Sequence, residues 1–159
     1  MSRIRLTLLL LVVVSCALAA AEAPRRRLII IVSPSQTITD ISVADLRRIY
    51  LGQITRWPNR HRIVTVILST RSYEGQLFLK RVIQMADLDY AQHWIGEVFR
   101  GHVAAAPLVA ASDVEAKRFV ALQPDAIAVI GDTTTMDPSV RMLTVDGKSA
   151  DAADYPLAW

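Results

Sequence analysis

Four consecutive polar residues, Ser69-Thr70-Arg71-Ser72, are the strongest candidates for a binding site in this sequence. They follow the apolar segment 63–68, which is typical of a buried strand, and they precede a segment with helical spacing. At such a junction, free backbone N–H groups and the helix dipole favour an anion. Hydroxyls and a guanidinium suit an oxyanion such as phosphate. The same residues also fit a simpler interpretation, in which Ser72 caps the helix and Arg71 is solvated.

The residue types that catalysis or metal binding requires are scattered along the chain. No pair of histidines has a zinc-ligand spacing, and no G-x-S-x-G motif surrounds Ser69 or Ser72. Asp87 and Asp89 are better interpreted as the start of a helix than as metal ligands. We therefore expect no catalytic residues, no metal and no cofactor. The histidines are His61, His93 and His102.

Alternation of apolar strands with amphipathic helices indicates an α/β domain. Continuous apolar runs at 28–32 and 63–68 are typical of strands buried on both faces, so helices are expected on both sides of the sheet. Three large aromatic residues, Tyr50, Trp57 and Trp94, are interpreted as core anchors. The full expectation is strand 28–32, helix 43–50 capped by Ser42 and ended by Gly52, strand 63–68, helix 73–85, a helix capped by Asp87 or Asp89 and reaching about 98, a loop at 101–111, helix 112–122 with a capping box at its start, strand 126–130 and strand 141–145.

Residues 1–21 have the pattern of an export signal. Arg3 and Arg5 precede the apolar stretch 6–14, and small residues at 19–21 offer a cleavage position before Glu22. An uncleaved anchor helix is one alternative, although spanning a bilayer takes about 20 apolar residues. Lipid attachment at Cys16 is another. We expect a signal peptide at 1–21, a domain at 22–159, and a periplasmic or secreted protein.

Composition narrows the class of protein once this segment is set aside. The whole chain has 159 residues, 52% of them hydrophobic, and a net charge of +3. Beyond residue 21 the hydrophobic fraction is about 49%, as in ordinary globular domains, and 16 basic residues face 15 acidic ones. The charge therefore gives little reason to expect nucleic-acid binding, and we expect no membrane span after cleavage.

Three stretches resemble the phosphate-type substrate-binding proteins of ABC transporters. Val32-Ser33-Pro34-Ser35 is similar to the V-N-P of that family. Residues 41–57, with Ile49-Tyr50-Leu51-Gly52 and Ile54-Thr55-Arg56-Trp57, are similar to its I-F-x-G-K-I-T-x-W, and residues 123–130 to its N-P-G-A-I-G-Y-V. The resemblance covers about residues 28–130. It implies a type 2 periplasmic binding protein fold with a central, mostly parallel sheet flanked by helices.

The resemblance also implies a function, the binding of an oxyanion such as phosphate, but the loop for that function differs from the family pattern. The anion loop of that family reads R-E-x-G-S-G-T-R, and the equivalent here is 68–75, without the Gly-Ser-Gly-Thr core and with an added Glu74. The length suffices for one lobe of a two-lobed receptor. We expect weak oxyanion binding at Ser69, Thr70, Arg71 and Ser72, completed by an ABC permease, another envelope partner or a homodimer. The alternative is an envelope interaction protein that keeps the lobe as a scaffold and has lost the ligand.

Overall fold

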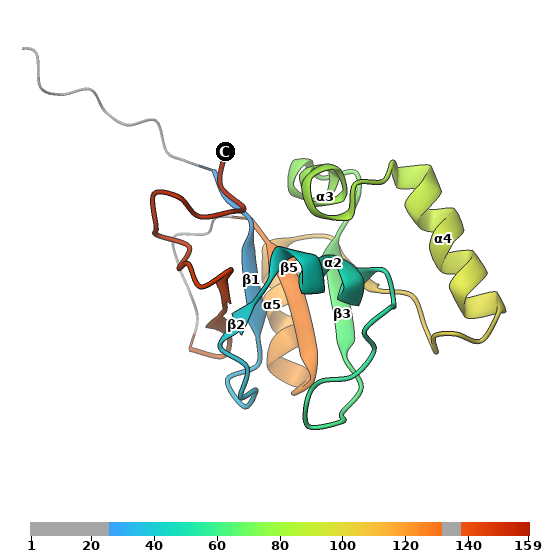
Figure 1. The fold of residues 1–159 in the computed structure, drawn as a ribbon, viewed down its shortest axis with the longest axis horizontal. Helices are drawn as coiled ribbons and strands as arrows, with labels where there is room; N and C mark the ends of the chain where they lie inside the picture. Colours follow the sequence, from blue (N-terminus) through green and yellow to red (C-terminus); the bar gives the residue numbers. More distant parts are fainter. Residues whose placement is uncertain (1–25, 132–137) are drawn as a thin grey trace, which may run out of the picture.

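The computed structural model describes residues 26–131 and 138–159, and a five-stranded mixed sheet lies at its centre (Figure 1). β3 pairs in parallel with both β4 and β5, whereas β1 pairs antiparallel with β5 and β6. All strands except β1 therefore run in one direction, as expected for a mostly parallel sheet. The strand order is β4 (Leu108–Ala110), β3 (Val64–Leu68), β5 (Ala126–Ile130), β1 (Ile29–Val32) and β6 (Arg141–Met142).

Helices cover both faces of this sheet because its central strands are apolar on both sides. Every residue of β1 and of β5 is buried. Helix α5 (Asp113–Leu122) lies behind the sheet in Figure 1, and α2 (Val43–Tyr50) lies in front of it. The chain then adds α3 (Tyr73–Phe78), a wider π-helical turn η2 (Leu79–Ile83) and α4 (Asp87–Phe99), which stands at one side of the molecule.

The Tyr50 side chain ties α2 to two strands at the centre of the core. It is fully buried, and its hydroxyl lies 2.8 Å from the Val66 carbonyl oxygen and 3.1 Å from that of Ile127. Tyr90 of α4 in turn donates to the Tyr50 carbonyl oxygen at 2.9 Å. Trp57 and Trp94 are also buried. The expected role of these aromatic residues as core anchors is confirmed.

Helix ends follow the sequence closely where a serine precedes the helix. Ser42 accepts a hydrogen bond from the Asp45 N–H, and Ser112 accepts one from the Glu115 N–H. The expected cap at Asp87 or Asp89 is wrong. Ala86 occupies the N-cap position of α4 without a side-chain bond, and both aspartates lie in the first turn, where their charge complements the helix dipole.

Three further expectations need correction. The loop expected at 101–111 contains β4, a strand too short to show periodicity. The expected helix 73–85 ends at residue 83 and widens into η2, which turns both Leu79 and Ile83 into the core. The single strand expected at 141–145 is two strands. β6 pairs with β1, and β7 (Thr144–Val145) pairs with β2 (Asp40–Ile41), because the Thr144 hydroxyl bonds Asp40 rather than the main sheet.

The expected signal peptide at 1–21 and the lipidation candidate Cys16 lie outside the described residues. Within 26–131 and 138–159, no helix is long and apolar enough to cross a membrane.

Replacing Tyr50 by phenylalanine is expected to lower the free energy of unfolding by about 1–2 kcal/mol, because two buried carbonyl oxygens lose their shared donor. Urea denaturation monitored by circular dichroism measures the change. Tyr73→Phe is the matched control, since this side chain is half exposed and its hydroxyl has no such position in the core. Equal stability of Tyr50→Phe and wild type would show that the hydroxyl contributes nothing.

Candidate functional site

The carboxyl ends of β3, β4 and β5 meet at one edge of the sheet because these strands run in parallel. The antiparallel register Ile29↔Ile130 brings the start of β1 to the same edge. In Figure 1 this edge is the upper one, beside α3. In open α/β sheets, ligands bind outside the carboxyl ends of the strands. The loop 69–72, for which the sequence predicts an anion site, follows β3 and lies at this edge.

The two serine hydroxyls of this loop are engaged in its own structure. Ser72 is the N-cap of α3: its Oγ accepts a hydrogen bond from the Gly75 N–H at 3.0 Å and donates to the Ser69 carbonyl oxygen at 2.7 Å. The Ser69 Oγ accepts the Arg71 N–H at 3.3 Å. The capping interpretation of Ser72 therefore holds, and its hydroxyl has little capacity left for a ligand.

Thr70, Arg71 and the O–H of Ser69, which only accepts a hydrogen bond in the loop, remain available to a ligand. The Arg71 residue is exposed, and no ion pair or hydrogen bond of its guanidinium occurs in the part of the chain that the structure describes. Thr70 is partly buried and lines the groove beside α4. One guanidinium and two hydroxyls at the edge of a sheet can hold an oxyanion only through a few contacts.

Gly75 fixes the position of α3 against the end of β3. A Cβ atom at this position would overlap the Ser69 carbonyl oxygen and would lie 2.8 Å from the Leu68 carbonyl oxygen. Helix and loop thus approach so closely that only glycine fits. The close approach packs the start of α3 directly onto the loop that carries Arg71.

Two carboxylates lie beside this loop. The Gly131 N–H, just after β5, donates to Asp113 Oδ1 at 3.0 Å. A Cβ at Gly131 would lie 3.0 Å from Glu74 Cγ and 3.3 Å from Asp113 Oδ2, so both acidic side chains reach the end of β5. Their negative charge opposes an anion at this edge. Glu74 is evident from the sequence because it follows the loop directly, whereas Asp113 of α5 is distant in sequence and reaches the end of β5 only in the folded chain.

A cluster of aromatic residues and one arginine lies beside α3. The Arg26 guanidinium lies 5.4 Å from the centroid of the Tyr73 ring, and the Trp159 ring lies 6.2 Å from the same ring. These residues come from the start of the described chain, from α3 and from the C-terminus. No local sequence pattern indicates such a contact.

The histidines occupy three separate places. His93 Nε2 lies 3.0 Å from the Leu51 carbonyl oxygen, His61 Nδ1 lies 3.2 Å from Asp125 Oδ1, and His102 Nδ1 lies 3.1 Å from Glu97 Oε2. Among the described residues, no group of three or more histidine, cysteine and acidic residues is arranged to hold a metal ion.

The stretches that carry the resemblance meet at the opposite end of the sheet. Gln36 Nε2 donates to the Pro124 carbonyl oxygen at 2.9 Å and to Asp125 Oδ1 at 2.8 Å. Trp57 Nε1 donates to the Asp125 carbonyl oxygen at 3.0 Å. This cluster joins the loop after β1, the loop before β3 and the turn before β5. Its role is structural, and the loop 69–72 lies at the other end of the strands.

Comparison with known proteins finds similar three-dimensional structures but no similar sequence. No protein-family model and no curated protein sequence matches the chain. Solved structures match over 84% of it, as follows. A phosphate ABC transporter substrate-binding protein with bound phosphate from Clostridium perfringens has a TM-score of 0.67 at 18% identity, over 53% of that chain. An ABC-type phosphate transport receptor from Vibrio cholerae has a TM-score of 0.65 at 20% identity, over 54% of that chain. PstS from Borrelia burgdorferi has a TM-score of 0.66 at 18% identity, over 55% of that chain.

The chain has the fold of about half of a substrate-binding protein. It spans about half the length of the solved structures that it matches. The expected α/β architecture, similar to one portion of a periplasmic binding protein, is therefore confirmed. At these levels of identity the likeness concerns the fold, and the loop 69–72 has to be judged from its own geometry.

Replacing Gly75 by alanine is expected to destabilise the protein by about 1–3 kcal/mol, because the new methyl group overlaps backbone oxygens that cannot move freely. Thermal unfolding measures the loss. Gly96→Ala in α4 is the matched control: its Cβ would meet only the flexible end of Arg100, so stability should stay within about 1 kcal/mol. Equal stability of the two variants would contradict the close packing of α3 on the loop.

Proposed function

We propose that the protein is an exported binding domain that holds a small oxyanion such as phosphate at the carboxyl end of β3, without catalysis. The observation that carries this proposal is the position of Arg71. Its guanidinium is exposed beside Thr70, at the sheet edge where ligands of open α/β domains bind, in a fold shared with phosphate-binding proteins. In this proposal the anion lies at the carboxyl ends of the parallel strands, and the Arg71 guanidinium binds its negative charge.

Binding by this domain alone should be weak. Ser72 already uses its hydroxyl as donor and acceptor within the loop, and Glu74 and Asp113 place negative charge nearby. A small ligand is usually enclosed over most of its surface, which one sheet edge does not achieve. We expect a dissociation constant on the order of 0.1 mM or weaker. A permease, another envelope protein or a second copy would complete the enclosure.

The same two carboxylates favour a second candidate, in which the domain is an envelope interaction protein without a small ligand. Glu74 and Asp113 both reach Gly131, so acidic groups stand where an anion would approach. In that case the edge would contact a protein partner instead. The two candidates differ in whether neutralising a carboxylate restores anion affinity.

Charge-neutral variants of the loop test the oxyanion proposal. Titration of the purified protein with phosphate, followed by NMR chemical shifts, should show saturable changes at residues 69–75 in wild type. Arg71→Gln should weaken binding at least tenfold, because the only free cation of the loop is lost, whereas Glu74→Gln should strengthen it severalfold. Arg81→Gln, an exposed arginine of η2, is the control for net charge.

Two results would contradict the oxyanion proposal. One is the absence of saturable shifts at this edge in both wild type and Glu74→Gln, which would favour the interaction protein. The other is equal affinity of Arg71→Gln and Arg81→Gln for phosphate, which would show that any loss of binding comes from the change in net charge and not from the position of Arg71.

Export is tested by the processed form of the protein. Expressed in a bacterium with an envelope, the chain should be recovered from the periplasm or the medium with its N-terminus at or near Glu22, as measured by mass spectrometry. Cys16→Ser should be processed in the same way, because the expected cleavage removes this residue. Recovery of the intact chain in the cytoplasm would contradict export, and a lipid-modified Cys16 would contradict cleavage at this site.

A further inference from the structure

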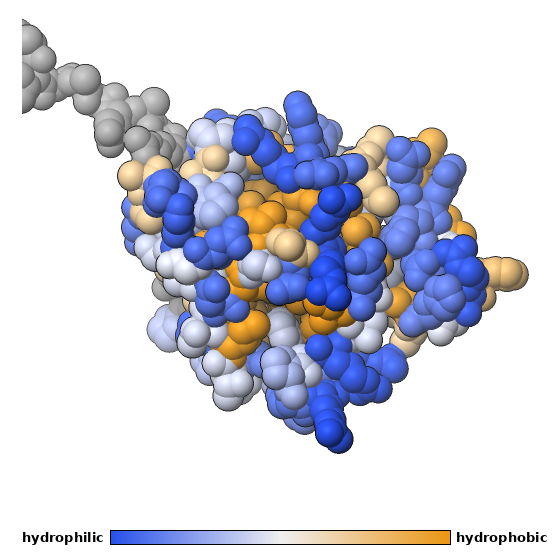
Figure 2. Space-filling view, in the orientation of Figure 1, coloured by the Kyte–Doolittle hydropathy of each residue, from blue (hydrophilic) through white to orange (hydrophobic). Residues whose placement is uncertain are grey.

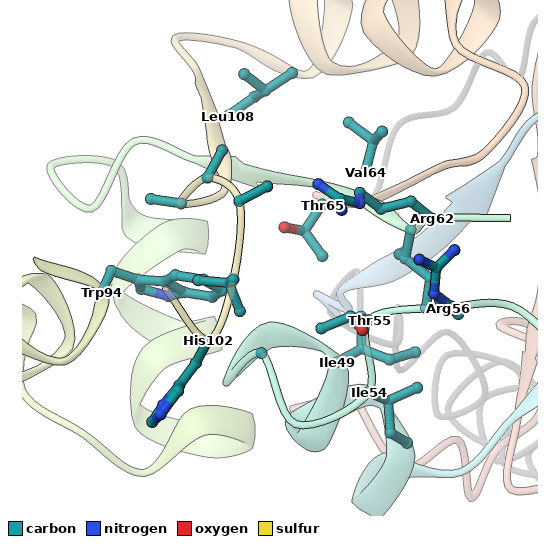
Figure 3. A pocket seen from close by; sticks show the side chains of 16 residues that line it. Ile49, Ile54, Thr55, Arg56, Arg62, Val64, Thr65, Trp94, His102 and Leu108 are labelled. Atoms are coloured by element: carbon teal, nitrogen blue, oxygen red, sulfur yellow. The ribbon is translucent and has the colours of Figure 1, made fainter. Parts of the chain in front are cut away.

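A second pocket lies at the opposite end of the sheet from the loop 69–72. Its volume is about 220 Å³, and it opens between the α2–β3 connection, the first residues of β3 and the segment that precedes β4 (Figure 3). An engineered cavity of about 150 Å³ is enough to hold benzene. The pocket therefore has room for a ring or a short chain. No part of it belongs to the oxyanion site proposed above.

The polar side of this pocket carries two arginines held on the same face of a hairpin. Arg56 and Arg62 form an isolated antiparallel bridge. Hydrogen bonds on either side of it, from Ile63 N–H to the Thr55 carbonyl oxygen at 3.0 Å and from Trp57 N–H to the His61 carbonyl oxygen at 2.9 Å, make it a non-hydrogen-bonded pair. The side chains of such a pair lie on one side and close together.

The guanidinium groups of Arg56 and Arg62 have no acidic partner within the described parts of the chain. Arg56 Nη1 donates to the Arg60 carbonyl oxygen at 2.8 Å, which orients this side chain. The nearby carboxylate of Asp125 is already bonded by Gln36 and lies 3.2 Å from His61. In Figure 2 the strongly hydrophilic side chains at the lower end of the molecule lie over this loop. The pocket thus has two cations without a counter-charge.

Hydroxyl and apolar groups complete the wall. Figure 3 shows the Arg62 side chain extending toward Thr65, with Thr55 close to Ile49 on the adjoining side. Trp94 and Leu108 lie across the pocket from the arginines, and the small residues 104–106 also line the pocket. The His102 ring points away from the cavity, toward Glu97. One side of the pocket therefore offers donors and the other offers an apolar surface.

We propose that this pocket binds a small carboxylate with an apolar ring or short chain, its carboxylate on Arg56 and Arg62. A guanidinium forms strong charge-assisted hydrogen bonds with a carboxylate. The apolar wall distinguishes such a ligand from inorganic phosphate, whose oxygens would face Leu108 and the alanine side chains without donors. The two ends of the sheet thus recognise different anions.

Benzoate is the probe for this pocket, with benzyl alcohol as its neutral counterpart. Calorimetric or NMR titration of the purified protein should show benzoate binding with a dissociation constant on the order of 1 mM. Chemical shift changes should centre on residues 62–65 and 103–108. Benzyl alcohol should bind at least tenfold more weakly.

Variants of one loop separate the pocket from general charge. Arg62→Gln should weaken benzoate binding at least tenfold, whereas Arg60→Gln, which removes the same charge from an exposed residue outside the pocket lining, should leave it unchanged. Arg71→Gln, at the other end of the sheet, should also leave it unchanged. All three side chains are exposed, so thermal unfolding should confirm intact folding.

Three results would overturn the proposal: no saturation by benzoate at concentrations on the order of 20 mM, equal binding by Arg62→Gln and Arg60→Gln, or benzyl alcohol binding as tightly as benzoate. Loss of phosphate binding at Arg71 would leave this pocket unaffected, so the two proposals fail separately.

Discussion

The burial of β1 and β5 on both faces is the constraint on which the rest of the structure depends. A strand that is apolar on both sides needs packing partners above and below, and α2 and α5 are held in those places. The two faces are therefore occupied by structure. Polar side chains that could bind a ligand are therefore found at the ends of the strands. The two candidate binding regions, the loop 69–72 and the pocket with Arg56 and Arg62, lie at opposite ends of the same sheet.

The sequence predicts those features whose cause is local. Apolar runs identify β1, β3 and β5, and serine caps place the starts of α2 and α5 to the residue. Features that depend on pairing between distant segments are not predictable in this way. β4 exists because β3 offers it an edge, and residues 141–145 divide because Thr144 bonds Asp40 instead of continuing beside β1.

In the candidate site, too, some features have a local cause in the sequence and others depend on contacts between distant segments. The position of residues 69–72 between a strand and a helix follows from the sequence, and so does the cap at Ser72. Two facts of the folded chain do not follow from it: the Ser72 hydroxyl bonds the Ser69 carbonyl oxygen, and Asp113 lies at the end of β5 beside Glu74. Local pattern thus locates the loop, whereas the electrostatics of the loop depend on contacts between strands.

The stretches that resemble a transporter family report on the fold more than on the ligand. Gln36, Trp57 and Asp125 join three loops at the end of the sheet away from Arg71. Their hydrogen bonds hold the start of β5 beside the loop that leads into β3. The contacts made by these stretches are therefore spatially separate from the loop 69–72.

Gly75 has a consequence for the way this architecture changes during evolution. Its lack of a side chain is required by the Ser69 carbonyl oxygen, whether or not an anion is bound. Selection on folding alone would therefore keep a glycine at this position. The glycine at the start of this helix is therefore explained by packing alone, whatever the loop 69–72 binds.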